Sequence, residues 1–345
     1  SYKMKDLSTK QNYYLTLWLR VMCAAIICMI FIGGLTRLTD SGLSITEWKP
    51  VTGILPPLTE ASWISEFDKY KQTPEYIKVN NNMNLAEFKS IFWLEFIHRI
   101  AGRITGILYI LPLMYFLYNK TISSAKIYIY LIGLILLISQ GIAGWYMVKS
   151  GLISAPCVSH FRLAIHLLLA IALYALLFWQ LMEQSFFKIP IGIKTNLVPL
   201  NIWLNICLVL LFIQITFGAF VAGLDAGLVY NQFPLMGDSI IPNEITFGTF
   251  GSNSFYDPVF VQFLHRILAY IVTLAILITC FIGFKIQNLL LSKVLIYLII
   301  ALIFQVMLGI FTLIYLVPIT LALLHQIGAV ILLSTLLWAK YLAVN

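Results

Sequence analysis

The 345-residue chain has little charge, because Asp, Glu, Lys and Arg together make up only 10% of it, against about 25% in an ordinary soluble protein. Residues of the set AVILMFWYC make up 61%, where roughly 45–50% is usual. A water-soluble fold cannot cover that much apolar surface, so lipid is the expected solvent for most of the chain. This composition excludes a disordered chain and a nucleic-acid binder that works through a basic patch. The net charge of +8 is therefore attributed to basic residues that set the orientation of the chain in the membrane.

Cysteine is also scarce, and its spacing shows no Cys-x-x-Cys pair and no paired loop arrangement. The five positions are Cys23, Cys28, Cys157, Cys207 and Cys280. Four of them lie in or near apolar runs, where a thiol behaves as a small hydrophobic group. Only Cys157 lies in a predicted loop, and no role is predicted for it. Neither a disulfide framework nor a zinc site is expected.

What the sequence does contain is apolar runs long enough to cross a bilayer, which takes about 20 residues. There are eight, at 14–35, 97–118, 126–148, 161–182, 200–223, 259–284, 291–314 and 318–339. We therefore predict an all-α integral membrane protein with eight transmembrane helices.

Basic residues in the loops predict the orientation of these helices. They gather at the amino terminus and after the even-numbered runs, at Lys3, Lys5, Lys10, Lys120, Lys126, Lys188, Lys194, Lys285, Lys293 and Lys340. The segment 224–258 contains no Lys or Arg. By the positive-inside rule both termini are cytoplasmic, and the segments 36–96 and 224–258 lie outside. Because the short basic amino terminus lacks the character of a transit peptide, a bacterial inner membrane is preferred over a mitochondrial one.

The second half of the chain repeats the first. The sequence LEFIHRI at 94–100 is answered by VQFLHRI at 261–267, and the segment 34–43 is similar to 220–228. Four helices in each repeat keep both halves in the same membrane orientation. We therefore expect two parallel-repeat four-helix bundles, an amino-terminal half of residues 1–190 and a carboxy-terminal half of residues 191–345.

Four of the five histidines occupy matching positions in this repeat, each predicted within about two turns of the outer end of an even-numbered helix. They are His98, His166, His265 and His325. Polar side chains inside a membrane usually face an interior site, and two facing histidines can hold a heme iron through their imidazole nitrogens. The expected pairs are the two in each half. Hydrogen bonding between helices is the alternative. His160 has no counterpart and is interpreted as an interfacial polar residue.

The neighbours of the histidines allow a flat macrocycle. Gly102 and Gly106 follow His98 by four and eight residues, so that a ring or another helix can approach closely. Four arginines lie at the same level, Arg99, Arg103, Arg162 and Arg266. They are candidates to bind heme propionates through charged hydrogen bonds or to anchor the helices among lipid headgroups.

The two halves differ at one informative position. Glu95 precedes His98 by one helical turn, and its counterpart before His265 is Gln262. A carboxylate can carry a proton, whereas an amide cannot titrate. This difference predicts chemistry in the first half and a permanent electron-transfer heme in the second. A salt bridge from Glu95 to Arg99 or Arg103 is the alternative.

At this level of detail the chain resembles the heme A synthase family, from Gly33 to about Trp338. The motifs that carry the resemblance are Gly34–Thr39, Ser41–Ser44, Trp48–Pro50, Gly53–Pro57, Glu95–Arg99, Gln140–Leu152, Arg162–Leu167, Gly218–Gly227 and Asn231–Met236. The similarity is to the branch of alphaproteobacteria and mitochondria, which has a long first external loop. The other branch carries a cysteine pair in its external loops, and the segment 36–96 has no cysteine.

The resemblance implies an enzyme that oxidises the C8 methyl group of heme O to a formyl group in two steps, through a hydroxymethyl intermediate. It implies that the amino-terminal half, with His98 and His166, holds the substrate heme, and that His265 and His325 hold a heme b cofactor. This agrees with the catalytic role predicted for Glu95 from its difference from Gln262. Besides heme O and membrane lipid, the implied partners are heme O synthase, an electron acceptor and cytochrome oxidase assembly factors. No nucleic-acid partner is expected.

Two other classes of function remain open from the sequence. One is a diheme b-type cytochrome that transfers electrons from a quinol without any chemistry on the porphyrin. It would require two equivalent hemes, which the difference between Glu95 and Gln262 disfavours. The other is a heme transporter or assembly chaperone, which would bind heme without converting it.

Overall fold

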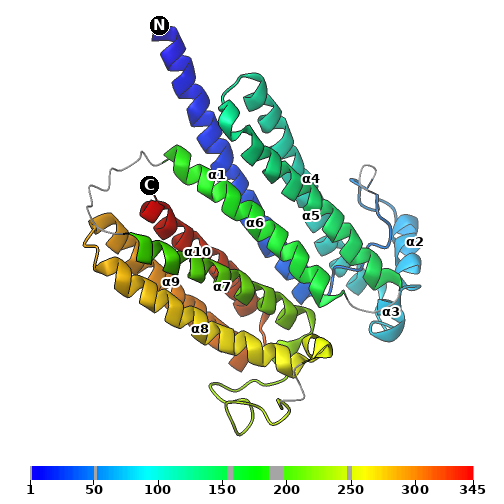
Figure 1. The fold of residues 1–345 in the computed structure, drawn as a ribbon. Helices are drawn as coiled ribbons and strands as arrows, with labels where there is room; N and C mark the ends of the chain where they lie inside the picture. Colours follow the sequence, from blue (N-terminus) through cyan, green and yellow to red (C-terminus); the bar gives the residue numbers. More distant parts are fainter. Residues whose placement is uncertain (1, 50–52, 154–157, 186–196, 247–250, 345) are drawn as a thin grey trace. The chain divides into compact units, whose positions relative to one another are not determined.

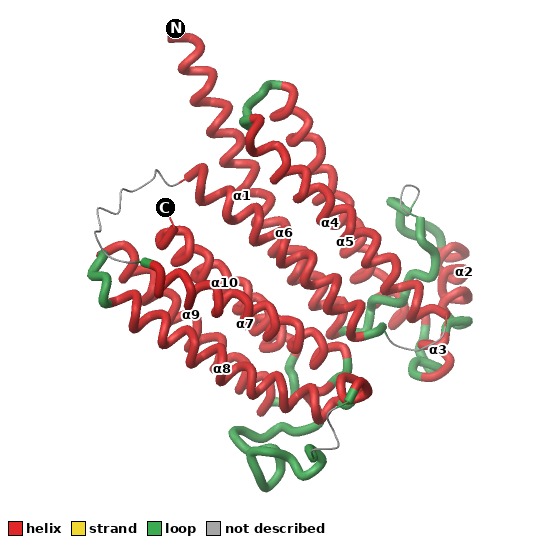
Figure 2. The backbone as a smooth tube through the Cα atoms, in the orientation of Figure 1, coloured by secondary structure: helices red, strands yellow, loops and turns green. Residues whose placement is uncertain are grey.

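The computed structural model of the chain describes residues 2–49, 53–153, 158–185, 197–246 and 251–344. Several features used above lie outside these ranges, namely Pro50, Cys157, Lys188, Lys194 and the boundary between residues 190 and 191. Over the described ranges the chain is helical and contains no strand (Figures 1 and 2).

Eight of the helices are long and apolar enough to cross a membrane, as predicted. They are α1 (Tyr2–Leu38), α4 (Leu85–Tyr118), α5 (Ile127–Ile153), α6 (His160–Ser185), α7 (Val198–Gly223), α8 (Pro258–Phe284), α9 (Leu289–Ile314) and α10 (Ile319–Val344). Two shorter helices, α2 (Glu60–Tyr70) and α3 (Pro74–Lys78), precede α4. Single 3-10 turns lie at Ser124–Lys126 (η1), Ala226–Leu228 (η2) and Ser252–Tyr256 (η4).

Helix α4 begins 12 residues before the apolar run predicted at 97, because a capping box starts it at Leu85. The Asn84 side chain accepts hydrogen bonds from the backbone N–H groups of Ala86 and Glu87, and the Glu87 carboxylate accepts one from the backbone of Asn84. Such reciprocal caps satisfy the free donors of a helix start. The first three turns of α4 therefore lie before the apolar run, on its amino-terminal side.

The segment predicted as a long external loop packs a small aromatic core of its own. The buried members of this core are Trp63, Phe67, Tyr70, Phe88 and Phe92. Ring centroids lie 4.9 Å apart for Trp63 and Phe92 and 5.0 Å apart for Phe67 and Phe88. Pairs of this kind contribute about 0.5–1.5 kcal/mol each beyond their buried area. The core fixes α2 and the segment before it against the extended start of α4.

By their contacts the residues divide into two compact units, one of residues 24–170 and the other of the remaining residues. In the second unit each of α7 to α10 packs against the next, and α10 also packs against α7, so the four close into a bundle (Figure 1). Polar contacts join these helices as well. The Asn201 amide donates to the carbonyl oxygen of Ala343 over 3.0 Å, and the Cys207 thiol lies 3.1 Å from the Thr279 hydroxyl.

In the unit of residues 24–170, α4 packs against α5, and the Tyr109 hydroxyl donates to the carbonyl oxygen of Tyr130 over 2.8 Å. Helices α1 and α7 end in the same way, because Asp40 and Asp225 both adopt the left-handed conformation, with φ of 48° and 49°. Asp tolerates this region better than most residues. The arrangement of the two halves as parallel repeats stays a prediction.

Candidate functional site

The four histidines predicted as ligands lie on the four even-numbered spans. His166, His265 and His325 follow the first residues of α6, α8 and α10 by six, seven and six positions, within two turns as expected. For His98 this expectation is wrong, because the early start of α4 puts 13 residues before it. His160 is the first residue of α6 and is 4% exposed.

Within each unit the structure brings the expected histidines together. The rings of His98 and His166 interact electrostatically, as do those of His265 and His325. The Nδ1 atoms of His166 and His325 are buried without a hydrogen-bond partner. Among the described residues no group of three or more His, Cys, Asp or Glu side chains could hold a bare metal ion. Paired imidazoles with unpartnered buried nitrogens fit axial ligation of a heme iron.

A glycine on the neighbouring odd-numbered span faces each of these histidines. A Cβ atom placed on the glycine would lie 3.5 Å from the imidazole for Gly33 and His98, 3.2 Å for Gly144 and His166, 3.3 Å for Gly218 and His265, and 2.8 Å for Gly309 and His325. The first is an ordinary contact, the next two are tight, and the last is a clash. A side chain here would press on the ring. The glycines thus leave room for a ring or a flat ligand beside the helix backbone.

The glycines singled out from the sequence behave differently. A Cβ atom on Gly102 would lie 3.7 Å from the Cε atom of Met29, and one on Gly106 would have no neighbour within 4 Å. Sequence reasoning missed the four glycines that face the histidines. Their signal was available, since one glycine recurs at a matching depth of each odd-numbered run.

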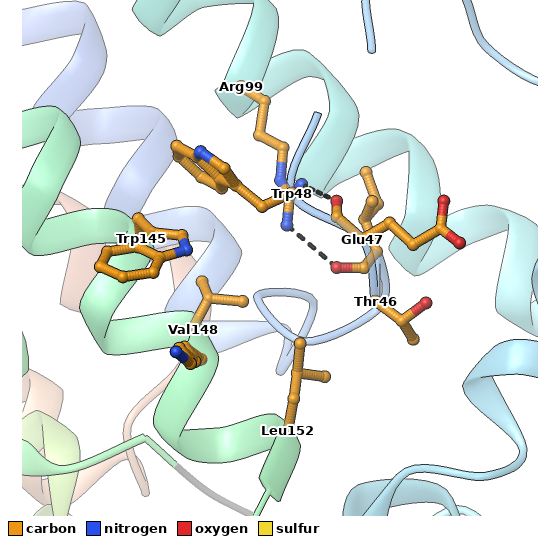
Figure 3. Close-up of a pocket in the computed structure, with 9 residues that line it drawn as sticks. Thr46, Glu47, Trp48, Arg99, Trp145, Val148 and Leu152 are labelled. Atoms are coloured by element: carbon orange, nitrogen blue, oxygen red, sulfur yellow. Dashed lines mark hydrogen bonds between the residues drawn. The ribbon is translucent and has the colours of Figure 1, made fainter. Parts of the chain in front are cut away.

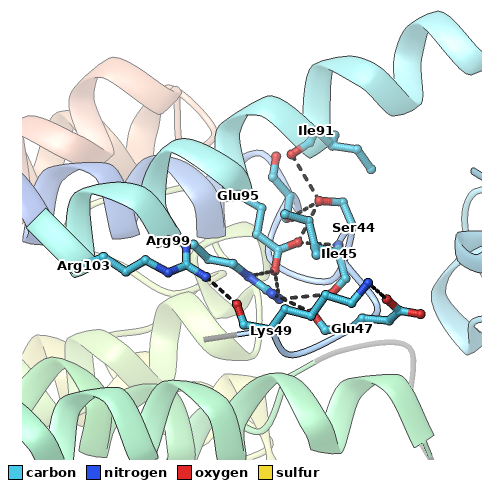
Figure 4. A network of polar contacts seen from close by, with 9 residues as sticks. Ser44, Ile45, Glu47, Lys49, Ile91, Glu95, Arg99 and Arg103 are labelled. Carbon is cyan, nitrogen blue, oxygen red and sulfur yellow. Dashed lines mark hydrogen bonds and ion pairs between the residues drawn. The ribbon is translucent and has the colours of Figure 1, made fainter. Parts of the chain in front are cut away.

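Glu95 is 2% exposed and accepts hydrogen bonds at both carboxylate oxygens (Figure 4). Its Oε2 atom accepts from the Ser44 hydroxyl and the Ile45 backbone N–H, each over 2.7 Å. Its Oε1 atom pairs with the Arg99 guanidinium at 2.6 Å. The ion pair considered from the sequence is therefore present. Arg103 instead donates to the carbonyl oxygen of Lys49 over 2.9 Å.

Arg99 and its repeat counterpart Arg266 each fasten a segment between two spans to a helix. Arg99 donates to the carbonyl oxygens of Ile45 and Glu47, each over 3.0 Å. Arg266 donates to the carbonyl oxygens of Tyr230, Gln232 and Leu235 over 2.9–3.2 Å. Their guanidinium groups thus hold backbone, and their binding of propionates stays a prediction.

Glu95 and Gln262 contact these segments with opposite hydrogen-bond polarity. Glu95 accepts from donors of its segment, whereas the Gln262 amide donates to the carbonyl oxygens of Ala226 and Tyr230 over 2.9 and 3.0 Å. Gln262 is also 2% exposed. Because each side chain matches its own segment, the amide at 262 does not show that an amide is tolerated at 95.

A cavity of about 310 Å³ lies beside this network (Figure 3). It is lined by Ile45, Thr46, Glu47, Trp48, Arg99, Trp145, Val148, Lys149 and Leu152. The Arg99 guanidinium lies 5.4 Å from the centre of the Trp48 ring, and the Lys149 ammonium 5.1 Å from that of Trp145. The cavity therefore combines aromatic walls with two cations. Lys149 was not identified from the sequence.

Arg162 lies on the same helix as His166 and stacks on Tyr146, with its guanidinium carbon 3.8 Å from the ring centre. It also donates to the carbonyl oxygen and the hydroxyl of Tyr146 over 3.2 and 3.1 Å. Arg162 is half-buried, so α5 fixes the direction of its guanidinium without covering it fully.

Two carboxylates outside the spans have shifted acidities. The ammonium groups of Lys49 and Lys69 lower the pKa of Glu47. The Lys69 Nζ atom lies 3.0 Å from the Glu47 Oε1 atom, and this ion pair links α2 to the wall of the cavity. Burial raises the pKa of Glu75 to about 7, although the Tyr70 hydroxyl donates to it over 2.9 Å. Glu75 was not identified from the sequence either.

Comparison with known proteins places this geometry in context. Residues 16–337 match the family model described as cytochrome oxidase assembly protein. The chain is 48% identical to the heme A synthase of Rickettsia felis over 332 residues, which cover 96% of this chain and 98% of that protein. It is 49% identical to the heme A synthase of Rickettsia akari over 328 residues, 95% and 97% of the two chains. The heme A synthase of Rickettsia bellii is 49% identical over 331 residues, 96% and 98%.

Proposed function

The chain belongs to the family of cytochrome oxidase assembly proteins, and from this we propose that it is a heme A synthase, an oxidoreductase that converts heme O into heme A. The observation that carries the proposal is the near-full-length similarity to heme A synthases. The paired histidines support it independently, because their buried ring nitrogens fit the iron of a heme.

The two pairs have separate tasks in this proposal. His98 and His166, in the half of residues 1–190, hold the heme substrate, and His265 and His325, in the half of residues 191–345, hold a heme b cofactor. The unpartnered Nδ1 atoms of His166 and His325 and the facing glycines Gly144 and Gly309 support heme binding by both pairs, and the difference between Glu95 and Gln262 supports their separate tasks. When bound, heme b supplies one-electron transfer.

The reaction proposed is oxidation of the C8 methyl group of heme O to a hydroxymethyl and then to a formyl group. His98 and His166 would hold the porphyrin through its iron. The Glu95 carboxylate takes up and releases a proton during the reaction. It lies in a network with Ser44, Ile45 and Arg99, which also fastens the segment of Ser44 and Ile45 to α4.

Cations near the outer ends of the helices are proposed to bind the propionates. They are Arg99, Arg103 and Arg162 in the first half and Arg266 in the second, and the exposed Lys149 in the aromatic cavity adds to the first set. We propose a multi-pass protein of the bacterial inner membrane with both termini in the cytoplasm. Heme O synthase, an electron acceptor and oxidase assembly factors are its proposed partners.

The test is expression of the chain in a bacterium that makes heme O and has no enzyme that converts it. Total heme is extracted from the membranes and separated by chromatography. We expect heme A and the hydroxymethyl intermediate to appear with the parental chain and to be absent with His98→Ala. Unchanged heme O with well-expressed parental protein would overturn the proposal.

A further inference from the structure

Three glutamines inside the spans make the same kind of contact with a histidine, and the proposed function above gives these glutamines no role. Each donates from its Nε2 atom to the backbone carbonyl oxygen of a proposed heme ligand. Gln140 donates to His166 over 2.8 Å, Gln214 to His265 over 3.0 Å, and Gln305 to His325 over 2.9 Å. The Gln214 Nε2 atom also lies 3.2 Å from the Nδ1 atom of the His265 ring, so this glutamine contacts the imidazole directly as well. Each glutamine also precedes by one turn the glycine that faces the same histidine.

The geometry lets the glutamine act on the position of the ligand. A helical carbonyl oxygen has two lone pairs and gives only one to its own helix, so the second can bind a donor from the neighbouring helix. A small residue lies four positions after each ligand histidine and leaves room for a side chain of the neighbouring helix to reach the carbonyl oxygen. These residues are Gly102, Ala170, Ala269 and Ala329. A Cβ atom on Gly328, three positions after His325, would collide with the Gln305 side chain.

The fourth ligand has a different neighbour. Met29 lies four positions before Gly33, where the other odd-numbered spans carry glutamine. Its Cε atom lies 3.7 Å from the Cβ position of Gly102, one turn after His98, so the side chain reaches the same region of the ligand helix. A thioether has no hydrogen to donate. The carbonyl of His98 therefore receives no hydrogen bond from this position of α1.

We propose that Gln140, Gln214 and Gln305 are positioning residues that fix the backbone, and through it the imidazole, of three heme ligands, and that Met29 leaves His98 as the exchangeable ligand. This inference rests on the proposed function. A permanent cofactor requires two fixed ligands, and both histidines of the second half have a glutamine. A substrate must bind and leave, and its pair has one fixed and one adjustable ligand.

The test compares Gln214→Met and Gln305→Met with the parental full-length holoprotein, each variant carrying the side chain that the chain itself uses at position 29. Transfer of heme b to excess apomyoglobin gives the dissociation rate, and electron paramagnetic resonance of the ferric low-spin heme reports the ligand orientation. We expect about tenfold faster loss of heme b, the effect of about one interhelical hydrogen bond, and shifted g values. Gln180→Met changes a buried glutamine that lies on α6 14 residues after His166 and makes no hydrogen bond to any of the four described ligand histidines, so it should change neither.

The reciprocal variant keeps the inference testable if a methionine variant does not fold. Met29→Gln should slow the dissociation of bound heme O several-fold and leave heme b unchanged. Unchanged heme b dissociation and g values in folded Gln214→Met and Gln305→Met, or unchanged heme O dissociation in Met29→Gln, would overturn the inference. A chain that makes no heme A but loses heme b faster in these variants would instead refute the proposed function and leave the positioning role standing.

Discussion

Replacement of Glu95 by glutamine separates a chemical role of this residue from a structural one. Glutamine has almost the same size, but it carries no charge and has only one acceptor oxygen. If that oxygen stays with Ser44 and Ile45, the amide nitrogen faces the Arg99 guanidinium, and two donors meet. If it turns to Arg99, the Ile45 N–H loses its acceptor. One contact is therefore lost in either orientation.

The loss of folding free energy caused by Glu95→Gln can be bounded from the structure. Removal of one partner of a buried ion pair costs about 3–5 kcal/mol. Arg99 keeps the carbonyl oxygens of Ile45 and Glu47 and its side chain is 12% exposed, so the lower end of this range applies. We expect the Glu95→Gln protein to fold with a loosened external segment. If the carboxylate carries the proton, conversion should fall by about 10²-fold or more.

Two further variants divide these effects. Glu95→Asp keeps the charge but shortens the side chain, so it weakens the contacts to Ser44 and Ile45 while it retains a titratable group. Ser44→Ala removes one hydrogen-bond donor to the Glu95 carboxylate and loosens the segment, but it leaves the carboxylate itself and its ion pair with Arg99 in place. Product is measured as heme A plus hydroxymethyl intermediate per chain, and the fold as detergent-stable protein by size-exclusion chromatography.

A proton-carrying Glu95 predicts that Glu95→Asp and Ser44→Ala retain far more conversion than Glu95→Gln. Accumulation of the hydroxymethyl intermediate would assign the residue mainly to the second oxidation, and accumulation of heme O to the first. Conversion near the parental rate in Glu95→Gln would refute the reasoning and leave Glu95 as the structural partner of Arg99.

Three other predictions follow from the described contacts. His265→Ala and His325→Ala should remove the low-spin heme b spectrum, whereas His98→Ala and His166→Ala should abolish conversion and retain most heme b; equal loss of heme b in all four would show that the halves are not specialised. Gly309→Ala should lower heme b content, because its Cβ atom would lie 2.8 Å from the His325 ring, while the control Gly106→Ala, with open space around it, should not. Since burial raises the pKa of Glu75 to about 7, the folded state binds its proton more tightly than the unfolded state, and helices α2 and α3 should lose stability as pH rises from about 5 to 8. Limited proteolysis of residues 53–84 at both pH values checks this, and Glu75→Gln should show no such change.

The eight spans could be predicted because hydropathy along the chain is enough to define them. The histidine pairs could be proposed because the repeat placed them at matching positions. The early start of α4 was readable in principle, since Asn84 and Glu87 have the spacing of a capping box. It was missed because the apolar run, and not the cap, was used to place the helix.

The contacts of Glu95 and Gln262 could not be predicted in the same way. Their polarity depends on whether a loop turns its N–H or its carbonyl groups toward α4 or α8, and this is set by loop backbone conformation rather than by residue type. The glutamine at the same position of three odd-numbered spans was visible in the sequence. Its meaning required the distances to the histidine carbonyl oxygens.

The identity of the heme bound to the purified protein shows directly whether this chain binds heme O and converts it. The chain is purified from cells that make heme O, and its non-covalent pigments are extracted, separated by chromatography and identified by mass. We expect heme B together with heme O, its hydroxymethyl derivative or heme A. Heme B alone, at two per chain, would contradict this expectation and identify a diheme electron-transfer protein instead.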